Sequence, residues 1–208
     1  VSAAAEGETL LSSHGAKQIL ASADGETVSI SEDLLKILNQ CGILYEKTGG
    51  VFDLTVAPLS DLWDVNHATA PPSPTEIDAA LAVVGWEGIS LSADSLTFSR
   101  AGMGIDIGSV GKGYGADLTV SALKNAGAQA GVVSFGGNIA LFGMRDGAPF
   151  RIGVRDPKGS GGDYLGILTL TDVSVVTSGA YERYFEYTET VYHHLLDANT
   201  GYPRESDL

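Results

Sequence analysis

A lysine and an aspartate lie within a run of small residues between Gly104 and Asp117, near the middle of the chain. Asp106 ends a short apolar run, and Lys112 follows it among glycines. Glycine lets a ligand approach the backbone closely because it carries no Cβ. The helical pattern that begins near Tyr114 would present unpaired N–H groups and a partial positive charge at its start. The spacing predicts a phosphate-binding loop beside a carboxylate, and a plain glycine-rich strand-to-helix turn fits it equally well.

The two common nucleotide motifs are incomplete in this segment. A Walker A loop reads G-x-x-x-x-G-K-[ST], but Asp106 stands at its first glycine and Gly113 at its Ser/Thr position. The dinucleotide fingerprint G-x-G-x-x-G fails because Ile107 stands at its third glycine. The pattern therefore indicates an anion site without naming the anion.

Asp53 lies in a second candidate segment, an apolar and aromatic stretch over residues 48–65. Pro58 is expected to break any regular element there. Loops of this composition can line a ligand pocket, and they can equally form a buried connection.

Composition excludes several classes of protein. The chain has 208 residues, with 26 acidic and 12 basic side chains and a formal net charge of −14. Such a surface repels nucleic acid and anionic membranes. No apolar run approaches the roughly 18–20 residues of a membrane span. No signal peptide is visible, and one that had been removed would leave no trace. Cys41 is the single cysteine, so no intrachain disulfide forms, and its place on an apolar helix face predicts core packing.

The elements that must position these residues follow from caps and periodicity. Ser31 predicts a helix start, and Gly49–Gly50 predict its end. Ser73 begins a capping box for a helix to about Val84. The glycine-rich segment leads into a helix that ends near Ala126. A short helix is possible over residues 16–21. Strands are expected at 89–91, 96–98, 130–135, 139–142, 151–154, 165–170, 173–176, 184–187 and 191–195. This mixture lacks a regular βαβ rhythm, so we predict an α+β fold.

Four segments in this order resemble the FAD:protein FMN transferases, the ApbE-like flavin transferases. They read TGGVFDLTVAPLSDLW, GIDIGSVGKGYGAD, VSFGGNIALFG, and TSGAYERYFE with YHHLLDANTGYP. The resemblance covers roughly residues 31–208. It implies a single domain over 1–208 in which mixed, largely antiparallel sheets are flanked by helices.

The activity implied by the resemblance is a Mg²⁺-dependent transfer. The enzyme would take FAD, move its FMN half to a Thr or Ser hydroxyl of a partner flavoprotein, and release AMP. Two alternatives stay open: an FAD pyrophosphatase giving FMN and AMP, and a non-catalytic flavin-binding protein. A displacement at a diphosphate needs its charge neutralised and a hydroxyl positioned, which suits the glycine-rich segment.

The resemblance also assigns roles to individual residues. His194 is the candidate general base, since a neutral imidazole can take the proton of the incoming hydroxyl near pH 7. His193 and His194 alternate along a predicted strand, so one of them should face solvent. Ser109 matches a position whose backbone carbonyl ligates the metal. FAD contacts are implied at Val51, Phe52, Asp53, Asp106, Lys112, Ser178, His194 and Leu195.

Three of the matched positions also have simpler interpretations. Ser178 either contacts a phosphate or ribose or bonds its own backbone in a turn. Gly136–Gly137–Asn138 is expected to bring the backbone close to the ligand. Asp197 is expected at least to cap a turn at Thr200–Gly201.

The family continues past the TGYP segment into a helix with an Asp and a Thr that bind the metal, and no equivalent pair precedes Leu208. We expect that the chain is truncated at its C-terminus, that another segment completes the metal site, or that the protein binds flavin without efficient transfer. By family analogy the location is periplasmic or otherwise extracytoplasmic, with a membrane anchor outside this sequence. The implied partner is the flavoprotein subunit of a membrane redox complex.

Overall fold

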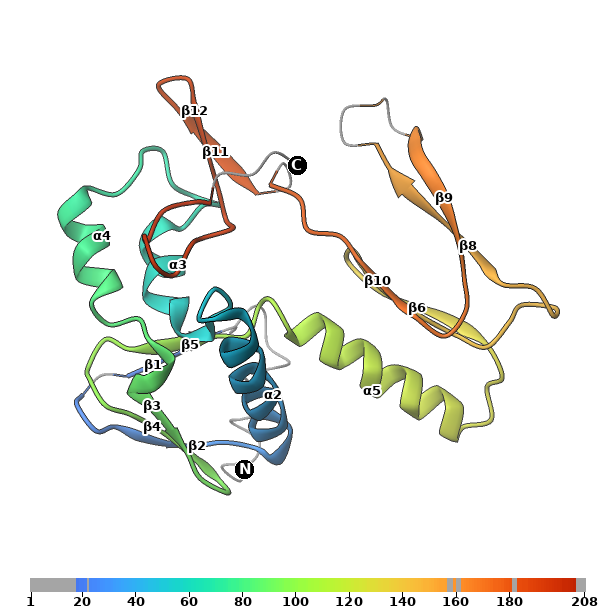
Figure 1. The fold of residues 1–208 in the computed structure, drawn as a ribbon, viewed down its shortest axis with the longest axis horizontal. Coiled ribbons are helices and arrows are strands. Elements are labelled where there is room, and N and C mark those ends of the chain that lie inside the picture. Colours follow the sequence, from blue (N-terminus) through green and yellow to red (C-terminus); the bar gives the residue numbers. More distant parts are fainter. Residues whose placement is uncertain (1–17, 22, 157–158, 160–161, 181–182, 205–208) are drawn as a thin grey trace. The chain divides into compact units, whose positions relative to one another are not determined.

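The fold combines helices with antiparallel strand pairs, as Figure 1 shows for the computed structural model. The structure describes residues 18–204 except 22, 157–158, 160–161 and 181–182. Every strand pairing among these residues is antiparallel. The predicted α+β class with largely antiparallel sheets is therefore confirmed.

The chain groups into two compact units. One unit contains Val1–Ser109 and Glu182–Leu208, and the other contains Val110–Tyr181. The second unit is thus inserted into the sequence of the first, and the boundary falls within the glycine-rich segment. That the units act together as the single domain expected over 1–208 stays a prediction.

Helix α2 (Glu32–Thr48) forms the first long element of unit 1. The Ser31 hydroxyl accepts from the N–H of Leu34, and Gly49 ends the helix in the left-handed conformation at φ 63°. Its apolar face buries Leu34, Ile37, Leu38 and Cys41. The predicted helix, both of its caps and the core position of Cys41 are confirmed.

Pro58 begins a helix instead of breaking the stretch over residues 48–65. The stretch folds into a 3-10 turn, η1 (Leu54–Val56), followed by helix α3 (Ala57–Trp63). Proline is tolerated in the first turn of a helix because the N–H it lacks would be unpaired there. The expectation of an irregular connection was therefore wrong.

Helix α4 (Pro74–Leu81) begins with the predicted capping box of Ser73 and Glu76. It ends three residues before Val84, and a 3-10 turn, η2 (Trp86–Gly88), leads into the next sheet. That sheet has the order β2-β4-β3, from β2 (Thr27–Ser29), β3 (Ile89–Leu91) and β4 (Ser95–Phe98).

The predicted short helix over residues 16–21 was wrong where the structure describes it. Gln18–Leu20 form strand β1, which pairs with β5 (Gly104–Asp106). Residues 16 and 17 lie outside the described part. A three-residue segment has little intrinsic preference, so the partner strand decides its conformation.

An aromatic cluster holds the C-terminal part of unit 1. Trp63 is fully buried and stacks against Tyr192, and its indole N–H donates to the Gly201 carbonyl at 2.7 Å. Phe185 and Tyr192 belong to the hairpin of β11 (Tyr184–Tyr187) and β12 (Thr190–His193). Helix α3 thereby positions both the hairpin and the turn that contains Gly201.

Unit 2 is built on helix α5 (Gly111–Asn125), which packs on a three-stranded sheet of order β10-β7-β6 (Figure 1). Its strands are β6 (Gly131–Phe135), β7 (Asn138–Phe142) and β10 (Ser174–Val176). A second pair, β8 (Phe150–Arg155) and β9 (Tyr164–Leu170), extends the unit. Ala116, Val133 and Ala140 form the buried contact between α5 and its sheet.

Candidate functional site

The glycine-rich segment becomes helical earlier than its sequence suggests. Helix α5 starts at Gly111, so Lys112 and Gly113 lie in its first turn and not in a loop. Gly111 and Gly115 have open space where a Cβ would be, whereas a Cβ at Gly113 would lie 3.3 Å from Asn138 Nδ2. The segment thus supplies a helix N-terminus made of small residues.

No local side chain caps this helix. Val110 stands at the N-cap position and offers no acceptor to the first turn. The first N–H groups of any helix lack partners within the helix, and together with the helix dipole they favour an anion. The N-terminus of α5 therefore keeps donors that a phosphate group can use.

Lys112 is directed to the turn between β6 and β7. Its exposed ammonium donates to the Gly136 carbonyl at 3.1 Å. Gly136 and Gly137 both have positive φ, at 49° and 86°, which allows the two-residue hairpin turn. The turn is also tied to the end of β10, since the N–H of Thr177 donates to the Gly137 carbonyl at 3.0 Å.

Unit 2 thus brings together several of the expected ligand contacts. Lys112, the Gly136–Gly137–Asn138 turn and the segment that starts at Thr177 share these hydrogen bonds. Ser178 follows Thr177 directly and is exposed. Its ligand contact and the alternative turn bond both stay predictions.

In unit 1, Asp106 ends β5, and Ser109 lies in the turn that follows it. Asp106 is half-buried, and its Oδ1 accepts from the Gly108 N–H at 2.7 Å. Ser109 is exposed. The hydrogen bond folds the backbone back at Gly108, so the Asp106 carboxylate shapes the bend before α5.

Asp53 is held inside unit 1 by its own neighbours. Its Oδ1 accepts from the backbone N–H and the hydroxyl of Thr55, both at 2.7 Å, and its Oδ2 accepts from the Trp86 N–H at 3.2 Å. Thr55 in turn accepts from the Gly85 N–H at 2.7 Å. Burial raises the pKa of the Asp53 carboxyl, and these hydrogen bonds oppose that rise. The side chain that sequence suggested for ligand contact thus fastens η1 to η2.

The other residues of this segment are more open. Val51 is 51% exposed and Phe52 is half-buried. Turn η1 packs directly on β5, so this segment lies beside the strand that ends at Asp106. Most of the stretch is therefore a buried connection, while its start at Val51 and Phe52 is accessible and could line a ligand pocket. Each of the two interpretations from the sequence holds for one part.

The two neighbouring histidines occupy different environments. His193 ends β12 and is buried, and its Nδ1 accepts from the Leu195 N–H at 3.2 Å. His194 lies beyond the strand and is half-buried, with Nδ1 3.3 Å from the Arg183 carbonyl. The predicted strand over 191–195 was too long, because β12 stops at His193, but one histidine of the pair is more exposed than the other, as expected.

Leu195 is half-buried, and the segment after it forms the predicted turn. The Asp197 carbonyl accepts from the Gly201 N–H at 2.8 Å, and its carboxylate accepts from the Asn199 N–H at 2.8 Å. Asp197 therefore caps this turn, as its sequence predicts.

A nucleophilic thiol and a metal cluster both lack support in the described residues. Cys41 is 2% exposed, and burial raises the pKa of its thiol to about 11.

Among the described residues no group of three or more His, Cys, Asp or Glu side chains could hold a metal ion. Mg²⁺ requires near-octahedral oxygen ligands, so Asp106 and a Ser109 carbonyl do not form a site by themselves.

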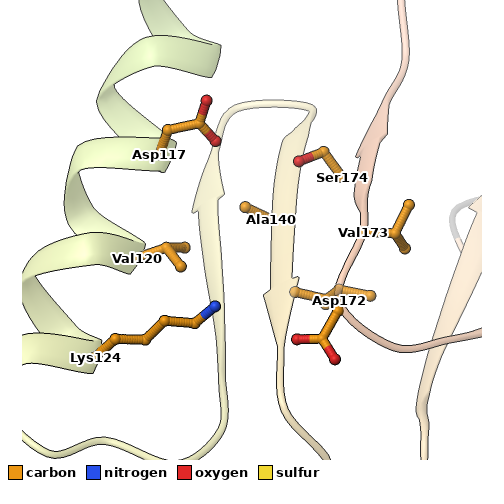
Figure 2. A pocket seen from close by; sticks show the side chains of 8 residues that line it. Asp117, Val120, Lys124, Ala140, Asp172, Val173 and Ser174 are labelled. Atoms are coloured by element: carbon orange, nitrogen blue, oxygen red, sulfur yellow. The ribbon is translucent and has the colours of Figure 1, made fainter.

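An open hollow of about 240 Å³ lies farther along α5. Figure 2 shows Asp117, Val120 and Lys124 on successive turns of the helix, facing Ala140 and the segment from Asp172 to Ser174. None of the predicted site residues lines this hollow. It is therefore separate from the helix N-terminus.

Comparison with known proteins gives consistent matches. The model of the ApbE family matches residues 5–208. The FAD:protein FMN transferase of Treponema pallidum is 32% identical over an alignment of 205 residues, and the match covers 90% of this chain and 57% of that protein. The enzyme of the same name from Vibrio cholerae is 31% identical over 182 residues, with 86% and 54% covered.

Solved structures agree with these matches. The ApbE protein of Thermotoga maritima superposes with a TM-score of 0.78 at 34% identity, over 86% of this chain and 60% of that one. The apo form of the flavinyl transferase ApbE of Pseudomonas stutzeri has a TM-score of 0.76 and a sequence identity of 31%. This match covers 88% of this chain and 58% of that one. The chain thus spans little more than half the length of the relatives it matches.

Proposed function

This chain belongs to the ApbE family, and on that premise we propose that it is part of an FAD:protein FMN transferase. The reaction moves the FMN half of FAD to a Thr or Ser hydroxyl of a flavoprotein and releases AMP. The oxygen of that hydroxyl forms a bond to the FMN phosphorus, the bond to the AMP oxygen breaks, and the hydroxyl proton passes to a base.

The observation that carries this proposal is the uncapped N-terminus of α5. Gly111 leaves the backbone open, Val110 provides no competing acceptor, and the Lys112 ammonium adds a full positive charge. These groups suit the FAD diphosphate, whose two negative charges need neutralising donors. In a chain with a net charge of −14, such a site must be positive locally.

The contact between His194 Nδ1 and the Arg183 carbonyl suits the role of a general base. The Arg183 carbonyl can only accept, so a hydrogen bond at 3.3 Å requires the proton on Nδ1. The lone pair of the neutral ring is then on Nε2, which is the nitrogen that would take the hydroxyl proton.

Mg²⁺ dependence belongs to the proposal as well. The described residues do not supply a complete ligand set, so further oxygen ligands are required from FAD, from water and from elsewhere in the full protein. Incubation of the full-length protein with EDTA should therefore abolish transfer, and added Mg²⁺ should restore it.

The reaction products distinguish the candidate functions. The full-length protein is incubated with FAD, Mg²⁺ and a flavoprotein acceptor domain, and the products are separated by chromatography and mass spectrometry. FMN covalently attached to the acceptor supports transfer. Free FMN with AMP supports the pyrophosphatase, and unchanged FAD that is nevertheless bound supports a flavin-binding protein.

Lys112→Ala should weaken FAD binding about ten- to hundredfold, because a hydrogen-bonding charge is removed from the diphosphate site. Titration of the protein with FAD, followed by flavin fluorescence, measures the change. Lys124→Ala is the matched control, since it removes the same charge from the last turn of the same helix. Equal affinities for the Lys112 variant and the wild type would contradict the phosphate assignment.

His194→Ala should leave FAD binding intact and slow transfer about 10²- to 10⁴-fold, the usual contribution of a general base. Transfer is measured under single-turnover conditions with saturating FAD. His67→Ala serves as control, because His67 is exposed and pairs with Asp64. A normal transfer rate in the His194 variant would end its role as base.

The location of the protein is a further part of the proposal. No helix in the described residues has the length and hydropathy to cross a membrane. An extracytoplasmic site of action is proposed from the family analogy alone, and fractionation of cells that produce the full-length protein would test it.

A further inference from the structure

The side-chain oxygen of Asn138, a residue of β7, is buried without a hydrogen-bond partner. The residue is 7% exposed, and its Oδ1 has no partner within the structure. Buried polar atoms in folded proteins are nearly always paired, so each exception needs an explanation. Thr171 Oγ1 is the other unpaired buried side-chain atom in the described residues.

The carboxamide of Asn138 faces the start of α5. Its Nδ2 lies 3.3 Å from the position that a Cβ of Gly113 would take, and Gly113 belongs to the uncapped first turn. Asn138 also directly follows the Gly136–Gly137 turn. The Gly136 carbonyl in this turn accepts a hydrogen bond from the Lys112 ammonium. Unit 2 therefore offers three kinds of donor at or next to the first turn of α5: the helix N–H groups, the Lys112 Nζ and the Asn138 Nδ2.

We propose that Asn138 is a ligand-binding residue whose amide nitrogen donates a hydrogen bond to a phosphate oxygen of FAD held at the N-terminus of α5. This deepens the proposed function and rests on it, because the ligand at that helix is the FAD diphosphate. An oriented amide donor can recognise an anion without adding charge. In this orientation Nδ2 is directed at the ligand and Oδ1 is left without a partner. An unfavourable buried atom of this kind is typical of a functional site.

A role in packing alone predicts a different result. Aspartate is close to asparagine in shape, and Asn138→Asp replaces the amide donor with an acceptor that repels phosphate. The ligand role therefore predicts a loss of FAD affinity of about tenfold or more for Asn138→Asp. Asn138→Leu removes the donor without adding charge, so the ligand role predicts a loss of FAD affinity for this variant too, whereas a packing role predicts little change in it.

The control uses the other unpaired atom. Thr171→Val removes a buried unpaired hydroxyl from the same unit with almost no change of shape, and we expect FAD affinity equal to that of the wild type. Riboflavin is the second probe, because it lacks phosphate. Its affinity should be the same for the wild type and for Asn138→Asp.

The test is a titration of the full-length protein with FAD and with riboflavin, followed by flavin fluorescence. Thermal unfolding of each variant is measured alongside. A selective loss of FAD affinity in Asn138→Asp, with riboflavin binding and Thr171→Val unaffected, supports the inference. Asn138→Ser, which also lacks the amide donor, gives the same test if the aspartate variant does not fold.

Two results would overturn the inference, and they are distinguishable. If the wild type binds FAD and Asn138→Asp binds it equally well, Asn138 does not contact the phosphate, and the proposed function stands. If the wild type binds no FAD, the proposed function fails and the inference fails with it.

Discussion

His193 and His194 use their Nδ1 atoms in different contacts. Nδ1 of His193 accepts from the Leu195 N–H, whereas Nδ1 of His194 lies beside the Arg183 carbonyl, which can only accept. His193 is buried and its hydrogen bond turns the backbone toward Leu195. This makes His193 a structural residue and leaves His194 as the better candidate base.

Asp53 is a second residue whose role follows from its contacts. It joins η1 to η2 through Thr55 and Trp86, and burial raises its pKa. In Asp53→Asn the amide nitrogen would meet the Trp86 N–H, donor against donor. We expect a loss of about 1–3 kcal/mol in the free energy of unfolding at neutral pH.

The pH dependence of this loss has a definite sign. A carboxyl with a raised pKa in the folded state binds its proton more tightly there than in the unfolded chain. Its contribution to stability therefore falls as pH rises from the ordinary value of 3.8 through the raised value, and it is constant above that. The advantage of the wild type over Asp53→Asn should shrink across this range.

Urea unfolding of both proteins between pH 3.5 and pH 7 measures that difference. Asp78→Asn is the control, because Asp78 is exposed on α4 and its removal should change little. An advantage of the wild type that grew with rising pH would contradict the assigned direction of the Asp53 pKa.

At the scale of single elements, α5 combines two kinds of glycine. Gly115 has open space around its Cα and lies inside the helix, whereas Gly113 packs against Asn138. An internal glycine costs a helix about 0.5–1 kcal/mol relative to alanine. Gly115 therefore only weakens the helix, whereas Gly113 leaves room for the side chain of Asn138.

Gly115→Ala should raise the free energy of unfolding by about 0.5–1 kcal/mol. Gly113→Ala should gain less or lose stability, because Asn138 must move, and it should also weaken FAD binding. Urea unfolding and FAD titration of the two variants provide the measurements. Equal gains in stability with unchanged FAD affinity would show that the contact between Gly113 and Asn138 has no consequence.

At the scale of the whole molecule, the dominant feature is the charge of −14. Like charges repel more in the compact state than in the unfolded chain, and salt screens this repulsion. We expect the Tm to rise as NaCl increases from 10 to 200 mM at pH 7. Screening worth about 1 kcal/mol would raise it by about 2–4 °C.

Differential scanning calorimetry at the two salt concentrations checks this expectation. At pH 5, closer to the isoelectric point of about 4.4, the same increase in salt should have a smaller effect. A Tm that fell with added salt at pH 7 would mean that favourable ion pairs outweigh the net repulsion.

The sequence by itself determined the elements whose signals are local. Ser31 and Ser73 marked helix starts because a cap acts within one turn of the chain. The Gly136–Gly137–Asn138 segment marked the break between two predicted strands, where both glycines adopt the positive φ that few other residues tolerate. The four family segments could also be read directly, and with them the family to which the chain belongs.

Only the tertiary structure decided features that depend on distant partners. Strand β1 forms because β5 pairs with it, and Trp63 holds Gly201, which lies 138 residues farther along the chain. The burial of Asn138 against Gly113 has no signal in either segment alone. Contacts of this kind depend on how the elements pack, and packing is not encoded in the spacing of neighbouring residues.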